Sequence, residues 1–178
     1  MVKRLAIIPA RKGSKRLKNK NIKLFCKKPL ISYSIDALKK SKLFSKIHIS
    51  TNSLKITKIA EKKGIKPDFL RPKSISNDSA NIDKVIKYVL KTYKKQNFYF
   101  DEVWLIFATN PFISVKFIRD AYKLYKLNNK NFSIMPVVKF NKPIEWSMKI
   151  DKKKKLKPIF KKKIFKNSDS FEKSYYEA

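Results

Sequence analysis

Ile7-Ile8-Pro9-Ala10-Arg11-Lys12-Gly13-Ser14-Lys15 is the stretch that decides the fold prediction for this chain. Its first residues close an apolar run, from Leu5 to Ile8, that is typical of a buried strand in a parallel sheet. A polar, basic segment with one glycine and one serine follows and predicts a loop. Because ligands of α/β proteins bind at the carboxyl ends of parallel strands, we expect a site here.

Beyond this stretch, predicted strands and helices alternate. Apolar runs at residues 46–50, 65–70, 103–107 and 132–138 indicate strands, and residues 30–38, 53–63, 82–93 and 114–127 have helical spacing. Ser53 and Ser114 are suited to cap two of these helices, and Gly64 to end one. The pattern predicts an α/β fold, a Rossmann-like, mostly parallel sheet with helices on both faces, in a single domain over residues 1–178.

Two segments lack this alternation. Residues 10–29 are polar and basic without an apolar period, and they predict a loop. Residues 152–166 contain nine lysines, and they predict either a hairpin with a solvated turn or a mobile arm.

The composition limits the classes of partner. The formal net charge is +32, but it comes from lysines spread along the whole chain, with only five arginines. Proteins that read nucleic acids favour arginine for two-pronged contacts, so this pattern favours a solvated lysine surface and disfavours a nucleic-acid partner. A basic nucleic-acid-binding module stays as an alternative. No stretch reads as a membrane span or a signal peptide, and a lone cysteine excludes an internal disulfide, so we expect a cytoplasmic protein.

The first loop has the chemistry of a polyphosphate site. Backbone N–H groups near Gly13, the Ser14 hydroxyl and several cations can all point at phosphate oxygens. The alternative is a solvated basic loop in a lysine-rich chain. The only glycines are Gly13 and Gly64, so the Walker A and dinucleotide-binding motifs are absent.

The order of residues in this loop resembles the first motif of the CMP-sugar synthetases, also called acylneuraminate cytidylyltransferases. That likeness runs through Ile7 to Arg16 and Asn19 to Ile22, and it continues at residues 49–53, 69–72 and 78–79. Ala108-Thr109-Asn110-Pro111-Phe112 is similar to the branch that activates pseudaminic acid. The resemblance covers essentially the whole chain. It implies a fold of the nucleotide-diphospho-sugar transferase type, with a small dimerisation arm at about residues 140–170, and hence a homodimer.

The resemblance also implies a reaction, in which CMP passes from CTP to a nine-carbon sugar acid, pseudaminic acid above all, and pyrophosphate leaves. Sialic, legionaminic or Kdo-type sugars are alternatives, as is a nucleotide-binding remnant without turnover. The residues carried over are Arg11 and Lys20 as catalytic groups; Arg11, Gly13, Ser14, Lys15 and Lys20 around the triphosphate; Asn21, Arg71, Asp78 and Ser79 around the rest of the nucleotide; and Thr109 and Asn110 on the sugar side.

This chain departs from the family pattern in two places. Asn52 stands where the family usually has an aspartate, and an amide supplies no charge to bind a cation. The chain also ends at Ala178, before the carboxylates that hold Mg²⁺ in related enzymes. We therefore expect Mg²⁺ as the cofactor with its ligands beyond this end, a family domain that lacks its C-terminal part, and weak or absent activity. The lone His48 is expected to be a strand residue and not a catalytic base.

Overall fold

The computed structural model describes residues 2–14, 17–77, 81–128 and 132–177. The chain divides into two compact units, Met1–Lys126 and Leu127–Ala178. The buried core lies in the first unit.

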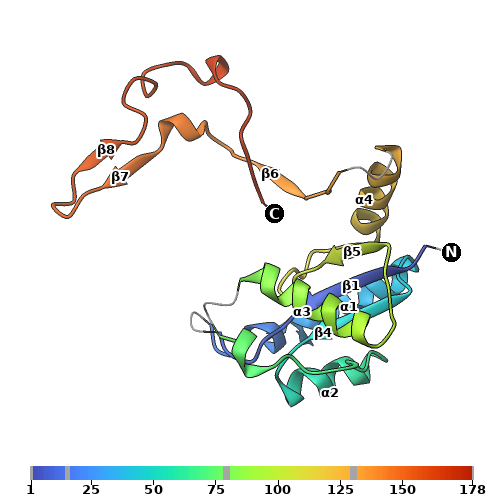
Figure 1. The fold of residues 1–178 in the computed structure, drawn as a ribbon. Helices are drawn as coiled ribbons and strands as arrows, with labels where there is room; N and C mark the ends of the chain where they lie inside the picture. Colours follow the sequence, from blue (N-terminus) through green and yellow to red (C-terminus); the bar gives the residue numbers. More distant parts are fainter. Residues whose placement is uncertain (1, 15–16, 78–80, 129–131, 178) are drawn as a thin grey trace. The chain divides into compact units, whose positions relative to one another are not determined.

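The core of the first unit is a parallel sheet of three strands. These are β1 (Arg4–Pro9), β4 (Lys46–Ser50) and β5 (Glu102–Leu105), in the order β4-β1-β5 (Figure 1). In the central strand, Ile7 lies beside His48 on one side and Leu105 on the other. Residues 5–8 of β1 are fully buried, because β1 has a strand on each side and helices on each face. The continuous apolar run therefore predicted this strand correctly.

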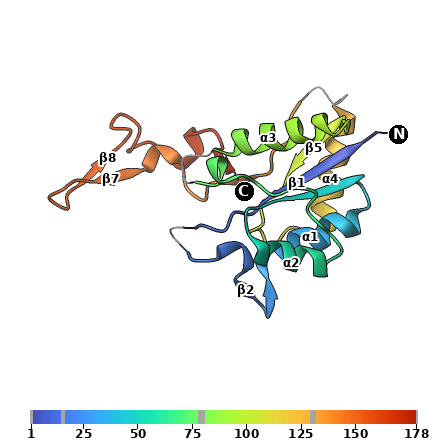
Figure 2. The ribbon, with the colours of Figure 1, turned by 60° about the horizontal axis from the view of Figure 1, so that its bottom comes forward.

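Helices cover both faces of the sheet, as Figure 2 shows. Alternate residues of β1 point to opposite faces, as in any strand. Ala6 and Ile8 belong to a cluster with α1 (Leu30–Ser41) and α2 (Leu54–Lys62), joined by α4 (Val115–Leu127). Leu5 and Ile7 pack on the other face, against α3 (Ile82–Lys95). The predicted α/β fold with a parallel sheet is confirmed.

Two of the three predicted helix boundaries are confirmed. Ser114 Oγ accepts a hydrogen bond from the Phe117 N–H at 3.1 Å and caps α4. Gly64 follows α2 with a φ of 74°, a left-handed conformation that favours glycine. Ser53 does not cap α2 through its side chain, contrary to the prediction; its carbonyl oxygen accepts from Thr57 instead.

The prediction of a strand at residues 65–70 is wrong. This segment has no strand pairing in the structure. Pro67 lies in its middle and lacks the N–H group that a ladder needs. The segment leads instead to Arg71, whose backbone N–H donates to Thr51 O at 2.7 Å. A short 3-10 helix, η2 (Lys73–Ile75), follows.

Residues 10–29 hold more structure than the predicted loop. A 3-10 turn, η1 (Lys20–Ile22), precedes an antiparallel hairpin of β2 (Leu24–Phe25) and β3 (Lys28–Pro29). The two residues of its turn, Cys26 and Lys27, have φ values of 46° and 62°. Asn and Gly are the usual signals for such a turn, so the sequence did not reveal it.

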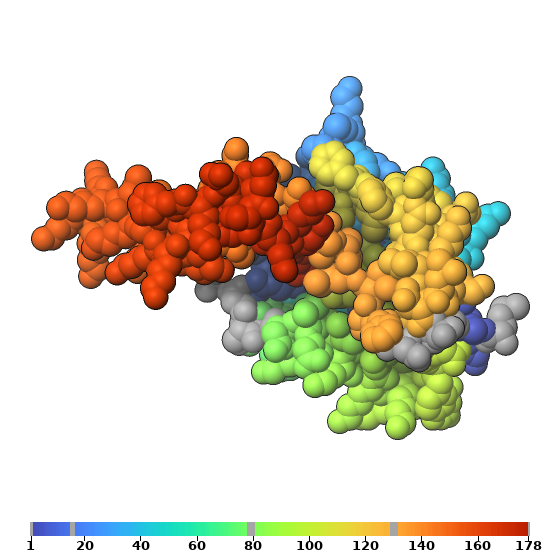
Figure 3. All heavy atoms as spheres, turned by 90° about the horizontal axis from the view of Figure 1, so that it is seen from above, coloured from blue at the N-terminus to red at the C-terminus, as the bar shows by residue number. Residues whose placement is uncertain are grey.

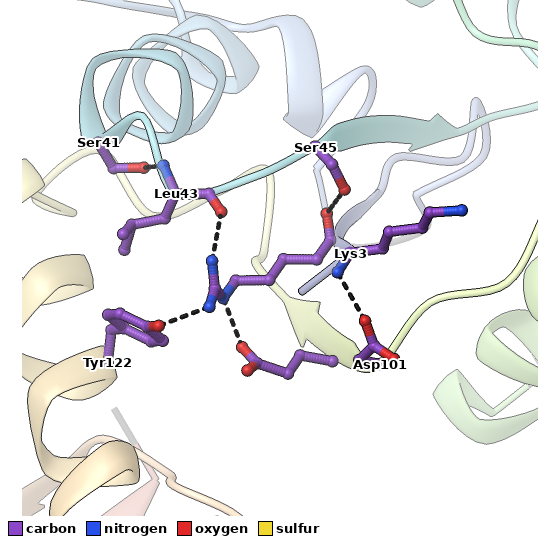
Figure 4. A network of polar contacts seen from close by, with 8 residues as sticks. Lys3, Ser41, Leu43, Ser45, Asp101 and Tyr122 are labelled. Atoms are coloured by element: carbon purple, nitrogen blue, oxygen red, sulfur yellow. Dashed lines mark hydrogen bonds and ion pairs between the residues drawn. The ribbon is translucent and has the colours of Figure 1, made fainter. Parts of the chain in front are cut away.

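A network of hydrogen bonds and an ion pair joins the segments at the amino ends of the strands (Figure 4). Arg4 Nε lies 2.7 Å from Glu102 Oε2, and the same guanidinium donates to Tyr122 Oη of α4 and to Leu43 O. The ring of Tyr122 lies 4.4 Å from the Arg4 guanidinium carbon, a cation–π contact. Glu102 is buried, so its charge is compensated by a partner on the neighbouring strand.

The second unit consists of two small antiparallel pairs. β6 (Val137–Lys139) pairs with β9 (Tyr175–Glu177), and β7 (Met148–Ile150) pairs with β8 (Leu156–Pro158). Two 3-10 turns, η3 (Ile144–Trp146) and η4 (Ser168–Ser170), lie between them. The strand predicted at residues 132–138 begins only at Val137. Of the two alternatives for the lysine-rich segment, a hairpin or a mobile arm, the structure shows a hairpin, formed by β7 and β8. In its turn, Asp151 Oδ1 accepts the N–H groups of Lys153 and Lys155.

The second unit lacks a core of its own. None of its described residues is buried, and many of its apolar side chains are exposed. Figure 3 shows the elongated form of this unit, in orange and red. Over the whole described part of the chain, no helix combines the length and apolarity needed to cross a lipid bilayer.

Candidate functional site

Three segments meet at the carboxyl edge of the parallel sheet. The chain leaves β1 at Pro9, β4 at Ser50 and β5 at Leu105, all on the same edge because the strands are parallel. The Ala10 N–H donates to Ser50 O at 2.9 Å and joins the first two of these exits. Arg71 adds a fourth segment through its hydrogen bond to Thr51 O. The predicted site residues on these segments are therefore gathered at one edge.

Arg71 is a buried cation at this edge. It is 6% exposed, and its Nε and Nη2 donate to Ser50 Oγ at 3.1 Å and Ser50 O at 2.6 Å. Both acceptors are neutral, and no carboxylate of the described residues pairs with Arg71. Burial, and to a lesser extent the positive charge of Arg11, lowers the pKa of Arg71 to about 10. A guanidinium in such surroundings is suited to an anionic ligand.

The first loop is held by two side-chain amides. Asn21 Nδ2 donates to Arg11 O at 3.0 Å, and Asn52 Oδ1 accepts the Lys12 N–H at 2.8 Å. From the sequence, Asn52 stands out as a departure from the family pattern, and Ser50 belongs to the motif at residues 49–53 without a role of its own. Their position directly after a strand, at 50–52, is the signal that marks them as neighbours of the loop.

Gly13 has open space where a side chain would be. A Cβ atom built there meets nothing within 4 Å, so neither crowding nor an unusual φ requires glycine at this position. Ser14, the next residue, and Lys20 are half-buried. The Lys20 ammonium group forms no hydrogen bond or ion pair with the residues that the structure describes. The loop therefore presents a free ammonium group and room for a group to approach its backbone.

Thr109 and Asn110 lie on the segment that follows β5, and both are half-buried. The Ser34 hydroxyl of α1 donates to Phe107 O at 2.9 Å, and the Asn110 N–H makes a turn back to the same carbonyl at 3.4 Å. This segment is thus attached to α1 at the edge where the first loop begins. Lys15, Asp78 and Ser79, the other predicted site residues, lie outside the described residues.

The described residues do not by themselves form a site for Mg²⁺. This ion prefers carboxylate and phosphate oxygens. No three His, Cys, Asp or Glu side chains come together among the residues described. Around the first loop, the side chains of Arg11, Lys12, Asn21 and Asn52 offer cations and amides.

His48 is part of a buried polar cluster behind this edge. Its Nδ1 lies 3.2 Å from Tyr93 Oη, which donates to Asp68, and its ring stacks on Phe69 with a centroid distance of 4.3 Å. Burial lowers the pKa of His48 to about 4, against the attraction of Asp68. The ring is neutral and packed inside the core, as expected of a strand residue.

Several known proteins are similar to this chain in sequence. A family model described as cytidylyltransferase matches residues 5–176. A pseudaminic acid cytidylyltransferase of Campylobacter jejuni is 32% identical over 177 residues, which are 99% of this chain and 76% of that protein. An N-acylneuraminate cytidylyltransferase of Escherichia coli is 38% identical over 140 residues, 78% of this chain and 32% of that protein.

Solved structures agree on the fold. The structure of CMP:2-keto-3-deoxy-manno-octonic acid synthetase complexed with CTP superposes with a TM-score of 0.57 at 18% identity. The match covers 76% of this chain and 50% of that one. At this identity the likeness supports the fold alone, and it agrees with the parallel sheet described above.

Proposed function

Because this chain belongs to the cytidylyltransferase family, we propose that it transfers CMP from CTP to a nine-carbon sugar acid, with pseudaminic acid as the first candidate. The oxygen of the sugar's anomeric hydroxyl attacks the α-phosphorus of CTP. A phosphorus–oxygen bond to the sugar forms, the bond from the α-phosphorus to the bridging oxygen breaks, and pyrophosphate leaves with the electron pair. The hydroxyl proton passes to solvent or to a base that we do not assign.

The observation that supports this most strongly is the buried guanidinium of Arg71. Buried charges in proteins are normally compensated, and Arg71 meets only the neutral oxygens of Ser50 among the described residues. A triphosphate bound at this edge would supply the missing negative charge. It would also reverse the lowering of the Arg71 pKa, since a bound anion stabilises the charged form.

The remaining residues then take roles in the same site. Arg11 and Lys20 would neutralise the charge that develops on the departing pyrophosphate, and such neutralisation is the main protein contribution to this kind of transfer. We propose that Gly13, Ser14 and Lys15 line the triphosphate. Asp78 and Ser79 are proposed beside the base or ribose, and Thr109 and Asn110 beside the sugar acid.

We also propose that the reaction uses Mg²⁺ and that it takes place in the cytoplasm. A polyphosphate attracts a divalent cation, so Mg²⁺ would arrive with CTP, and we assign it no ligand among the described residues. The cytoplasm supplies the nucleotide.

A turnover assay with several sugar acids tests the proposal. The full chain is incubated with CTP, Mg²⁺ and, in turn, pseudaminic, N-acetylneuraminic, legionaminic and Kdo acids. Pyrophosphate release and CMP-sugar formation are both measured. We expect the largest kcat/KM with pseudaminic acid, and loss of activity in Arg71→Met but not in Arg119→Met, a matched change of an exposed arginine on α4. CTP binding without turnover with any sugar would instead identify a nucleotide-binding chain.

One comparison favours a second substrate. The E. coli N-acylneuraminate cytidylyltransferase has the higher identity of the two relatives, 38%, although over fewer residues. In the same assay, a higher kcat/KM with N-acetylneuraminic acid would replace pseudaminic acid in the proposal and leave the reaction type unchanged.

We also propose that residues 140–170 form a dimerisation arm within one family domain. The described residues of this arm expose apolar side chains on isolated pairs of short strands, which are marginally stable in water on their own. A second copy of the chain would cover them. Sedimentation should show a dimer, and hydrogen exchange in 148–158 should slow as concentration rises. A monomer with unchanged exchange at all concentrations would contradict the arm's role.

A further inference from the structure

The loop that leaves β1 lacks packing to define its conformation. After the Ala10 N–H bond to Ser50 O, the ladder of the sheet ends. Lys12 and Gly13 are exposed, and a Cβ at Gly13 would have no neighbour within 4 Å. Steric contact therefore does not fix the direction of the backbone N–H groups here. A loop whose backbone must face phosphates needs another constraint.

Two amides supply constraints from two sides. Asn52, just past β4, accepts the Lys12 N–H at 2.8 Å, and Asn21, in η1, donates to Arg11 O at 3.0 Å. The two bonds hold consecutive residues of the loop, one through its carbonyl and the next through its N–H. Because Lys12 N–H and Arg11 O belong to the same peptide unit, together they fix the orientation of that peptide plane.

We infer that Asn21 and Asn52 are positioning residues, which clamp the Arg11–Lys12 peptide and thereby aim the Arg11 side chain and the following N–H groups at the triphosphate. The inference rests on the proposed function, but the clamp itself is a property of the ligand-free protein. An amide suits this task since it donates or accepts without a charge. A carboxylate would accept the Lys12 N–H equally well, so the contact requires an acceptor and not a particular charge.

The clamp has a thermodynamic consequence. Without it, the loop must be ordered when CTP binds, and the lost backbone freedom weakens binding. Once CTP is bound, the chemistry can proceed from a similar geometry. We therefore expect removal of one amide to raise the KM for CTP about 10-fold and to change kcat less.

Three variants distinguish the effect of the lost hydrogen bonds from effects of charge and of misfolding. Asn52→Leu removes the acceptor, Asn52→Asp keeps it and adds a charge, and Asn21→Leu removes the second bond. Gln96→Leu, at an exposed amide at the end of α3, is the matched control. Hydrogen exchange of the Lys12 amide is measured in the ligand-free proteins, and KM and kcat are measured for CTP.

The expected pattern is specific to a clamp. Lys12 exchange should be at least about 10-fold faster in Asn52→Leu and unchanged in Asn52→Asp, and the KM for CTP should rise in Asn52→Leu. Asn21→Leu should raise KM with the same small change in kcat, and Gln96→Leu should change nothing. Unchanged Lys12 exchange in Asn52→Leu would overturn the inference. If the wild-type chain binds no CTP, the proposed function fails, and the exchange data still decide whether the clamp exists.

Discussion

Two arginines lie at opposite edges of the same three-stranded sheet, Arg4 half-buried and Arg71 buried, and their surroundings differ. Arg4, at the amino edge, lies 2.7 Å from the carboxylate of Glu102 and also contacts Tyr122. Arg71, at the carboxyl edge, has only the two oxygens of Ser50 as partners among the described residues. The pKa of Arg71 is lowered to about 10, and no carboxylate of the residues that the structure describes offsets its burial.

The different partners of Arg4 and Arg71 suit different tasks, stabilisation of the fold and binding of a ligand. A partly buried ion pair joins elements, and Arg4 connects β1, β5 and α4 in this way (Figure 4). A buried cation with neutral partners carries an unbalanced desolvation penalty, which a bound anion can offset. The contacts of the amino edge therefore stabilise the fold, and those of the carboxyl edge suit the proposed binding of a negatively charged ligand.

Arg4→Met should give the largest effect and tests the amino edge. The substitution leaves the buried Glu102 carboxylate without its strongest partner, and such losses cost about 3–5 kcal/mol in the free energy of unfolding. Urea denaturation measures this change. Arg119→Met, at an exposed site, should stay within about 0.5 kcal/mol of the wild type. If Arg4→Met and Arg119→Met were equally stable, the stabilising role assigned to the amino edge would be contradicted.

Acid should weaken the fold through His48, which lies between the two edges and is the only histidine of the chain. Its folded-state pKa of about 4 lies below the ordinary value of 6.5, so protons bind preferentially to the unfolded state. The stability from neutral His48 is fully present above pH 6.5 and is lost as the pH falls toward 4. Asp68 opposes the lowering of the pKa, while Lys46 and Arg71 reinforce it.

The expected loss between pH 7.5 and pH 5 is about 2 kcal/mol. It is measured by urea denaturation at both values. In His48→Asn the difference should shrink to the small part that carboxylates contribute over this range. A wild-type stability that does not change between pH 7.5 and 5 would show that His48 titrates normally in the folded protein.

Gly13→Ala should change binding and leave stability alone. The added methyl group meets nothing within 4 Å, so the free energy of unfolding should stay within about 0.5 kcal/mol of the wild type. The methyl group would occupy space that a phosphate needs, and we expect about 10-fold weaker CTP binding. Calorimetry and urea denaturation together test this. Gly64→Ala is the opposite control, because its φ of 74° strains alanine and the change should destabilise the protein.

Most of the first unit could be predicted from its sequence. The apolar run of β1, the helical spacing of α1 to α4 and the stop at Gly64 are local signals, and local physics decides them. A strand was wrongly predicted at residues 65–70, because the apolar residues there have the pattern of a strand but Pro67 prevents strand pairing. The hairpin turn at Cys26 and Lys27 was hidden, since neither residue type favours a positive φ.

The sequence predicted the first loop and Arg71 as parts of a site; the structure places both at the carboxyl edge of the sheet, and their roles stay a prediction. What could not be predicted is which groups hold the loop. The contacts of Asn52 with Lys12 and of Ser50 with Arg71 join residues that are 40 and 21 positions apart. Such pairings depend on strand register, and a single sequence does not contain that information.

Titration of CTP and CMP into the wild-type chain and Arg71→Met tests the central claim most directly. The account predicts that the wild type binds CTP more tightly than CMP, because the additional phosphates meet the cations of this edge. It also predicts about 30-fold weaker CTP binding by Arg71→Met, with unfolding free energy changed by less than about 1 kcal/mol. Equal binding of CTP and CMP, or undiminished CTP binding by Arg71→Met, would contradict the account.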